Sequence, residues 1–315
     1  MFGLETLDVL IGLMTVYFTF GIACTAIVEA ISAWANIRSK NLDLALKELF
    51  SGELAPKEQF ITQFYAHPLI QSLSKGQNGI PSYIPPEIVG QVVESLVVGK
   101  TVMATLSAGV SSLPGTAENN RIKGILETFV MQTENDATQF RQAVAKQFDA
   151  VMDRASGWYK RKTQTITLIV AALLVLSGNV DTLKIATVLA LNPAAREKMV
   201  NIAQQTLDEA KKQSEEKTSN TPKTDVKQAK DKVTDATAEY ERAVATFEAT
   251  GLSFGWKGLP HTLWEYLAKA AGLLVTIFAV SLGGQFWFDT LQRVMQIRST
   301  GPKPPDPDQP ARKKK

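Results

Sequence analysis

The sequence predicts an all-α membrane protein with three transmembrane helices, a mainly helical cytoplasmic domain and an external helical hairpin. The first observation is the placement of charge. Charged residues make up 21% of the 315 residues, yet residues 9–28, 163–180 and 270–288 contain none. About 18 apolar residues are enough for a helix to cross a hydrocarbon core of about 30 Å. We therefore predict transmembrane helices at 7–34, 163–180 and 267–288.

The five tryptophans support the same three spans. Trp34 follows the first uncharged run and Trp158 precedes the second, while Trp256, Trp264 and Trp287 lie near the ends of the third. Indole rings favour the headgroup level of a bilayer, because one edge is apolar and the N–H needs a partner. In a soluble protein these residues would be scattered through the cores.

The Lys and Arg residues near the span ends predict an orientation. They cluster after the first run, before the second and after the third, although the formal net charge is only +3. By the positive-inside rule the N-terminus lies outside, residues 37–162 are cytoplasmic, residues 181–265 are outside and the C-terminus is cytoplasmic.

Residues 37–162 are long enough for a small helical domain. A helix is expected at about 38–50, and a short one at 60–70 that stops near Pro68. Pro86 can open a further helix that ends at about Gly99. The apolar stripe at 120–160 then predicts one long stalk helix, which can run directly into the second span.

The external segment reads as two helices, at 193–217 and 225–249. Asn192 and Pro193 are typical of a helix start, and small apolar residues recur in a heptad-like pattern in the second helix. The alternative is a solvated, partly disordered polar insertion. Residues 300–315 are rich in Pro and Lys, and we expect a disordered basic tail that contacts anionic lipid.

Motifs that carry chemistry are almost absent. The chain has no P-loop, no dinucleotide-binding glycine pattern and no zinc-protease motif. It has one Cys, Cys24, and two His, which the predicted orientation places on opposite sides of the membrane. We therefore predict no catalytic site, no cofactor and no metal. The basic tail has no interleaved aromatics, so nucleic acid is not an expected partner.

Glu29 is the most informative single residue of the predicted spans. It precedes Trp34 by five residues, which is about 7.5 Å along a helix at about 1.5 Å per residue. A carboxylate at that depth needs a partner or a proton. The favoured hypothesis is that Glu29 forms a salt bridge that holds the spans together. The alternative is that Glu29 belongs to an ion or proton site. Its candidate partners are Arg161, Lys162 and Arg293.

Two aromatic and Pro-rich stretches stand out in the cytoplasmic domain. They contain a candidate docking segment made of Tyr65, His67, Pro68, Pro81, Tyr83 and Pro85. Rigid segments of this kind suit a protein–protein contact. They also suit a chain that only turns back to the membrane, and both readings stay open.

Several short segments carry a resemblance. They are residues 24–31, 38–42, 64–70, 81–85, 179–183 and 286–289. Together, and in this order, they resemble a family of uncharacterised bacterial inner-membrane proteins. The resemblance implies membrane residence and a bacterial source, so we expect the bacterial inner membrane as the location. It implies no activity, so no catalytic residue is carried over.

Three functions are consistent with these observations. The first is a non-catalytic membrane-anchored interaction or assembly component, whose partners are the lipid bilayer and another protein or a second copy of itself. The second is an oligomeric channel or transporter subunit, with Glu29, Asp181 and Asp289 near the path. The third is a membrane enzyme that acts on lipid or envelope precursors, for which His67 and Asp289 are the only candidates. We favour the first, because catalytic groups are lacking.

Overall fold

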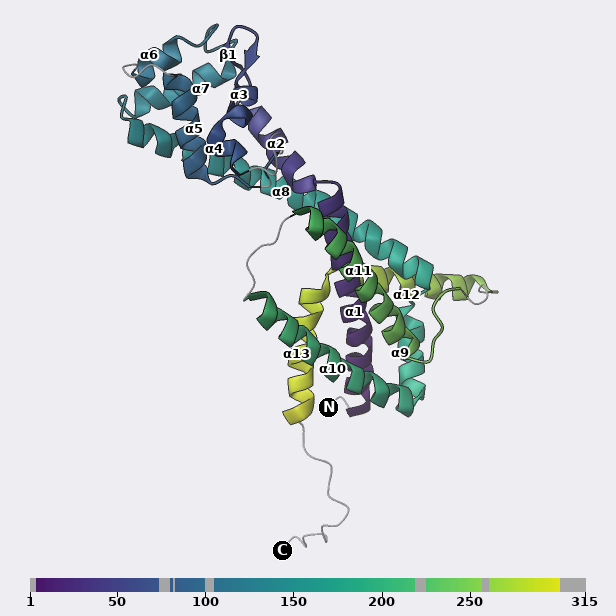
Figure 1. The fold of residues 1–315 in the computed structure, drawn as a ribbon. Coiled ribbons are helices and arrows are strands. Elements are labelled where there is room, and N and C mark those ends of the chain that lie inside the picture. The colour runs from purple at the N-terminus through teal and green to yellow at the C-terminus, as the bar shows by residue number, and fades with distance from the viewer. Residues whose placement is uncertain are drawn as a thin grey trace, which may run out of the picture. The chain divides into compact units, whose positions relative to one another are not determined.

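The computed structural model describes residues 4–73, 80–81, 83–99, 105–218, 225–256 and 261–300 (Figure 1). Over these residues the chain is almost entirely helical, as predicted. The only strands among them are β1 (Glu53–Ala55) and β2 (Glu58–Gln59), which form one antiparallel pair. The chain divides into two compact units, with residues 1–31 and 164–315 in unit 1 and residues 32–163 in unit 2. Two long helices, α1 (Leu4–Trp34) and α8 (Ala137–Gly178), continue from one unit into the other.

Unit 2 is a small helical domain with a single hydrophobic core. Its helices are α2 (Ile37–Leu49), α3 (Phe60–Ala66), α4 (Pro68–Gln71), α5 (Pro86–Val98), α6 (Leu106–Ser111), α7 (Arg121–Gln132) and the first part of α8. The ring of Phe50 lies 5.5 Å from that of Phe60 and 5.4 Å from that of Phe64, centroid to centroid. Pro68 and Pro86 each stand at the first position of a helix. The helices predicted at 38–50, 60–70 and after Pro86 are therefore confirmed, with a short break at His67.

The structure divides the predicted stalk helix 120–160 in two. Helix α7 ends at Gln132, and Glu134 and Asn135 adopt left-handed backbone angles, with φ of 49° and 67°. Oδ1 of Asp136 then accepts a hydrogen bond from the backbone N–H of Gln139 at 2.7 Å, which caps α8. Glu134 and Asn135 make this turn and Asp136 caps the next helix, so the chain turns without Gly or Pro. The prediction of one continuous helix relied on the absence of those two residue types. From there α8 runs without interruption into the second uncharged window.

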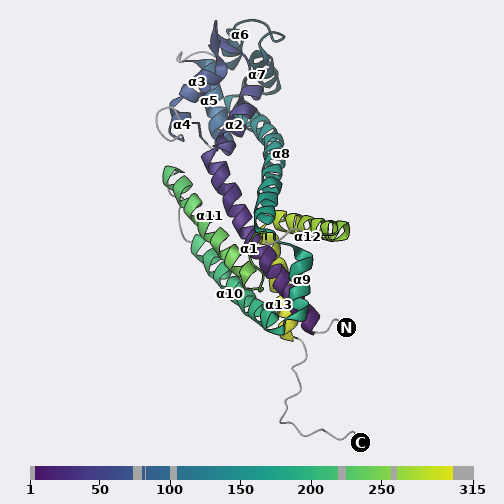
Figure 2. The same ribbon diagram turned by 90° about the vertical axis from the view of Figure 1, so that its right-hand side faces the viewer.

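Unit 1 is built around α1. It contains the second part of α8 together with α9 (Thr182–Leu191), α10 (Pro193–Thr218), α11 (Asp225–Glu248), α12 (Leu263–Ser281) and α13 (Gly284–Thr300). Phe20 and Cys24 belong to a buried cluster shared with α8, α9 and α11, while Ile11 and Phe18 belong to one shared with α10 and α13. Helices α10, α11 and α13 lie beside α1 in both views (Figures 1 and 2). Apolar side chains of α1 therefore contact protein on more than one side.

Within the described part of the chain, two helices are long and apolar enough to cross a membrane, namely Glu5–Trp34 and Leu263–Ser281. Helices α8 and α9 meet at an angle of 51° and pass the same test only as a pair, which gives up to three spans. The described chain is therefore compatible with a helical membrane protein.

The segment predicted as a single span at 267–288 is not one continuous helix. Helix α12 ends at Ser281, Gly283 adopts a φ of 83°, and α13 begins at Gly284. A Cβ atom added to Gly21 of α1 would lie 3.0 Å from the carbonyl carbon of Gly283, so the turn sits directly on α1. The adjacent glycines at 283 and 284 permit both the left-handed turn and this close approach.

After this turn, α13 returns along the N-terminal half of α1. The rings of Trp287 and Tyr17 lie 4.8 Å apart between centroids, and Nε of Arg298 lies 2.7 Å from Oδ1 of Asp8. The predicted orientation places Asp8 and Arg298 on opposite sides of the membrane. If α1 crosses the bilayer, an ion pair of 2.7 Å requires Asp8 and Arg298 to lie on the same side of the membrane.

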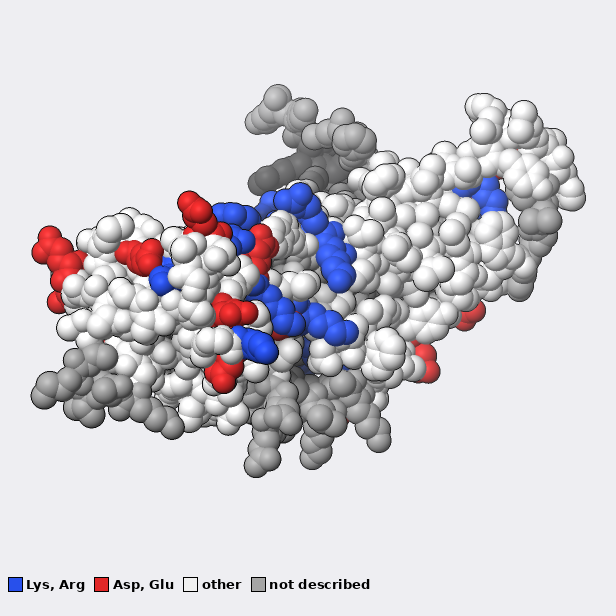
Figure 3. Space-filling model, turned by 90° about the horizontal axis from the view of Figure 1, so that it is seen from above, with Lys and Arg blue, Asp and Glu red and all other residues white. Residues whose placement is uncertain are grey.

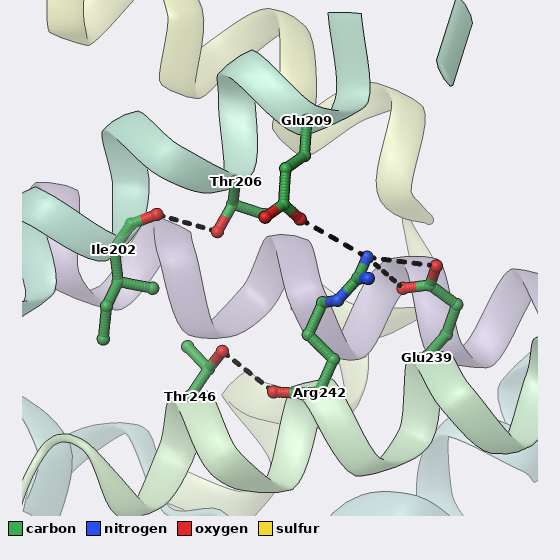
Figure 4. A network of polar contacts seen from close by, with 6 residues as sticks. All are labelled: Ile202, Thr206, Glu209, Glu239, Arg242 and Thr246. Carbon is green, nitrogen blue, oxygen red and sulfur yellow. Dashed lines mark hydrogen bonds and ion pairs between the residues drawn. The ribbon is translucent and has the colours of Figure 1, made fainter. Parts of the chain in front are cut away.

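The two segments expected to form an external hairpin are both helical over their described residues. Nη1 of Arg242 on α11 lies 3.8 Å from a carboxylate oxygen of Glu209 on α10 and 3.3 Å from one of Glu239 (Figure 4). The hydroxyls of Thr206 and Thr246 donate to backbone carbonyls of their own helices. The connection at 219–224 and the tail at 301–315 lie outside the described residues.

Candidate functional site

Glu29 lies at the surface of unit 1. Its side chain is 56% exposed, and its Oε2 lies 3.6 Å from Nζ of Lys232 on α11. The ion pair is thus made with the segment that was expected outside the membrane. Arg293 lies on α13 between Trp287, which contacts Tyr17, and Arg298, which contacts Asp8. It is therefore displaced toward the other end of α1, while pairing of Glu29 with Arg161 or Lys162 stays a prediction.

All acidic residues of α1 have a basic partner. The helix contains Glu5, Asp8 and Glu29 and no Lys or Arg. Arg196 of α10 lies 3.9 Å from Glu5, and Arg298 of α13 and Lys232 of α11 pair with the other two. Each partner comes from a different helix, so the three pairs attach three helices to α1. Exposed pairs of this kind contribute about 0–1 kcal/mol each, so they specify an arrangement more than they stabilise it.

A chain of buried hydroxyls lies where α1, α9 and α12 meet. The Tyr17 hydroxyl lies 2.8 Å from Oγ1 of Thr182, which lies 2.8 Å from Oγ1 of Thr276. Thr276 donates to the carbonyl of Gly272 at 2.8 Å. Because each hydroxyl has one proton, the direction is fixed: Tyr17 donates to Thr182, and Thr182 donates to Thr276. The three side chains are 7%, 8% and 0% exposed.

Asp181 completes this polar cluster. It is 6% exposed, and its Oδ1 accepts hydrogen bonds from the backbone N–H groups of Leu183 and Lys184. A Cβ atom on Gly272 would collide with the same oxygen. The cluster therefore forms at the break between α8 and α9, where the chain turns through Asn179 with a φ of 54°. The hydrogen bonds of the cluster join its own residues to one another and to nearby backbone, so the cluster links α1, α9 and α12.

Sequence reasoning singled out Asp181 but missed Tyr17, Thr182 and Thr276. These hydroxyls stand in or beside uncharged runs, where Ser and Thr can satisfy their own helix backbone. Their partners are separated by 165 and 94 residues, so the pairing depends on tertiary contacts. A polar residue at a helix break inside an apolar region is the signal that could have directed attention there.

The predicted docking segment separates into buried and exposed residues. Pro81 is buried, and Pro85 directly precedes α5 at its N-cap position. Tyr65 packs against the core, and its pKa is raised, first by burial and then by the neighbouring Asp43 carboxylate. Tyr83 is 70% exposed although the next residue, Ile84, is only 1% exposed.

His67 has a structural role in this segment. Its Nδ1 accepts the backbone N–H of Leu69 at 3.3 Å and so caps α4, where Pro68 is the first residue. Its Nε2 lies 3.3 Å from the hydroxyl of Ser95 on α5. Burial lowers the pKa of His67 below its ordinary value. Asp289, the other catalytic candidate, is exposed on α13 and accepts a hydrogen bond from Gln285.

Four exposed apolar side chains stand close to residues 74–79 in the sequence, two before and two after them, and we call them the Tyr83 surface. They are Leu69, Leu73, Ile80 and Tyr83, at 38%, 39%, 42% and 70% exposure. They lie on α4 and on the segments that flank residues 74–79. Among the described residues, no three His, Cys, Asp or Glu side chains are grouped so that they could hold a metal ion.

Comparison with protein-family models, with curated proteins and with solved structures gave no match.

Proposed function

We propose that the protein is an integral membrane protein that holds a helical docking domain, unit 2, at the membrane surface. Unit 1 supplies the anchor. Its candidate spans carry apolar side chains that are more than half exposed, such as Leu173 at 64%, Leu274 at 54% and Phe278 at 64% exposure. Hydrocarbon is the environment in which such side chains are stable.

The observation that carries the docking proposal is the exposure of Tyr83. Four phenylalanines of the unit 2 core, Phe60, Phe64, Phe140 and Phe148, are at 2% exposure or less, whereas Tyr83 lies outside that core. A domain that packs its core this closely and still exposes Tyr83, Ile80, Leu69 and Leu73 has an apolar surface suited to a protein partner. Tyr is among the residue types that contribute most to such contacts.

A photo-crosslinking experiment tests this function. A photoreactive phenylalanine analogue is placed at Tyr83 or at Gln142, an exposed residue of α8 in the same unit. We expect irradiation of intact cells to give a crosslinked product of defined mass from position 83 and none from position 142. Equal products at both positions, or no product at 83 from a protein that is folded and membrane-bound, would refute the docking proposal.

A pair of variants separates docking from folding. Tyr83→Ser and Ile80→Ser remove exposed apolar surface only, so we expect the Tm to change little while the crosslinked partner is lost. The channel and enzyme hypotheses stay predictions. The surface position of Glu29 gives no support to a path through the membrane at that residue.

A further inference from the structure

Two basic segments lie side by side in unit 2. One is the stretch 34–41, where α1 ends and α2 begins, and the other is the stretch 154–162 of α8. The side-chain amide of Asn41 donates to the carbonyl of Ala155 at 2.9 Å. Nε of Arg38 donates to the hydroxyl of Tyr159 at 3.3 Å. These contacts join the segments although they are more than 110 residues apart in sequence.

The two segments contain no acidic residue. They contain six basic ones, and all six are exposed: Arg38, Lys40, Arg154, Lys160, Arg161 and Lys162. The nearest carboxylates along the chain are Asp153 and Asp43, and Asp43 pairs with Lys47 at 2.7 Å. Figure 3 shows Lys and Arg side chains on the face of the molecule that is viewed from above, with Asp and Glu side chains beside them. Six like charges on two adjoining segments create a positive potential that attracts an anionic partner.

Two exposed indole rings stand among these charges. Trp34 is 81% exposed and Trp158 is 41% exposed. Trp34 is the last residue of a helix that is apolar enough to cross a membrane, and Lys162 directly precedes an uncharged run of 18 residues. Exposed Trp beside Lys and Arg at the ends of apolar runs is typical of residues at the headgroup level of a bilayer.

We propose that this face, which we call the basic–aromatic face, binds the phosphate headgroups of anionic phospholipids. The basic side chains supply the charge, and the two indoles supply the apolar contact just below the phosphates. Nucleic acid also binds basic and aromatic surfaces. The lipid is favoured because both segments adjoin candidate membrane spans, which keeps the face beside the headgroups.

The test uses the full chain in a neutral detergent, titrated with phosphatidylglycerol or with phosphatidylcholine. The rise in Tm with lipid gives an apparent affinity. The variant is Lys40→Gln combined with Lys160→Gln and Lys162→Gln. The matched control is Lys57→Gln combined with Arg121→Gln and Lys146→Gln, which removes three exposed charges elsewhere in unit 2.

We expect the first triple variant to bind phosphatidylglycerol on the order of 100-fold more weakly at low salt, since each basic residue at an anionic surface contributes about fivefold. The control variant should keep its affinity, and phosphatidylcholine should not distinguish the proteins. Added salt should weaken phosphatidylglycerol binding by the parent protein. A Lys→Arg version of the first triple should restore binding, which separates lost charge from lost folding.

Three outcomes would overturn the proposal. The first is an unchanged phosphatidylglycerol affinity in the triple variant, and the second is an equal loss in the control variant. The third is a single-stranded RNA that binds the parent protein without lipid and is lost in the triple variant, while phosphatidylglycerol binding persists. That last result would assign the face to nucleic acid.

Discussion

The hydroxyl chain of unit 1 gives the sharpest prediction. Thr182→Val keeps the shape of the side chain and removes its oxygen. Tyr17 then loses the acceptor that lies 2.8 Å from its hydroxyl. Thr276 is less affected, because it still donates to Gly272 and still accepts the backbone N–H of Thr182 at 3.2 Å. The main consequence is one buried donor without a partner.

An unpartnered buried hydroxyl costs about 1–3 kcal/mol, and a lost hydrogen bond about 1 kcal/mol. We therefore expect Thr182→Val to lower the free energy of unfolding by about 3 kcal/mol. Tyr17→Phe removes a donor and leaves Thr182 bonded to Thr276, so its cost should be about 1 kcal/mol. In the double variant no donor is left unpaired. Its cost should therefore be smaller than the sum by about 1–2 kcal/mol, the upper part of the range seen for such pairs between membrane helices.

Thermal or denaturant unfolding of the four proteins in one detergent measures this coupling. Control variants are Thr187→Val and Thr237→Val, whose hydroxyls are exposed and donate only to their own helix backbone. They should change stability by less than about 0.5 kcal/mol. Additive single costs, or a larger cost for Tyr17→Phe than for Thr182→Val, would refute the order of donors along the chain.

Three further predictions concern other positions. Gly272→Ala should destabilise unit 1 by about 1–3 kcal/mol, because the added methyl group meets Asp181. The control is Gly157→Ala, where a Cβ would meet nothing within 4 Å, and it should be neutral or stabilising in the same unfolding assay. Equal effects of the two substitutions on stability would contradict the packing at Gly272. His67 has a lowered pKa, so the unfolded chain takes up the proton first and stability should fall as the pH drops below about 6.5. His67→Asn, which can still cap α4, should lose that pH dependence in unfolding curves from pH 7.5 to 5, and a parallel loss in both proteins would count against it. In a Cys24→Ala background, Thr6→Cys and Ser299→Cys should each react with a membrane-impermeant maleimide added to the same side of the membrane, as the Asp8–Arg298 pair requires. Labelling of the two positions from opposite sides would instead support the orientation predicted from the basic residues.

Local signals in the sequence predicted much of unit 2. Pro68 and Pro86 mark helix starts because proline suits the first helical turn. The break after Gln132 was missed because Glu134 and Asn135 adopt left-handed angles without a glycine. Gly283 did carry a usable signal, but the apolar run around it suggested one continuous helix. Hydropathy reports composition, and it does not report where a backbone turns.

The candidate site was harder to predict because its residues meet only in the folded chain. Tyr83 looked like part of a Pro-rich turn, and the sequence could not tell its exposed ring from the buried Ile84 beside it. Glu29 was expected to need a partner, and it has one, but Lys232 lies 203 positions further along the chain. Charge alone identified the residue, whereas the choice of partner depends on how α11 packs against α1.

Hydropathy also ranks the candidate spans in the wrong order for contact with lipid. Helix α1 is the more apolar, with a mean hydropathy of 2.0 against 1.5 for α12. Yet 67% of its apolar window is buried inside the protein, compared with 28% for α12. A helix at the centre of a unit must be apolar toward its protein neighbours, whatever surrounds the unit. Of these two spans α12 is the less buried, so a substitution such as Phe278→Lys should disturb membrane insertion more, and internal packing less, than a comparable substitution in α1.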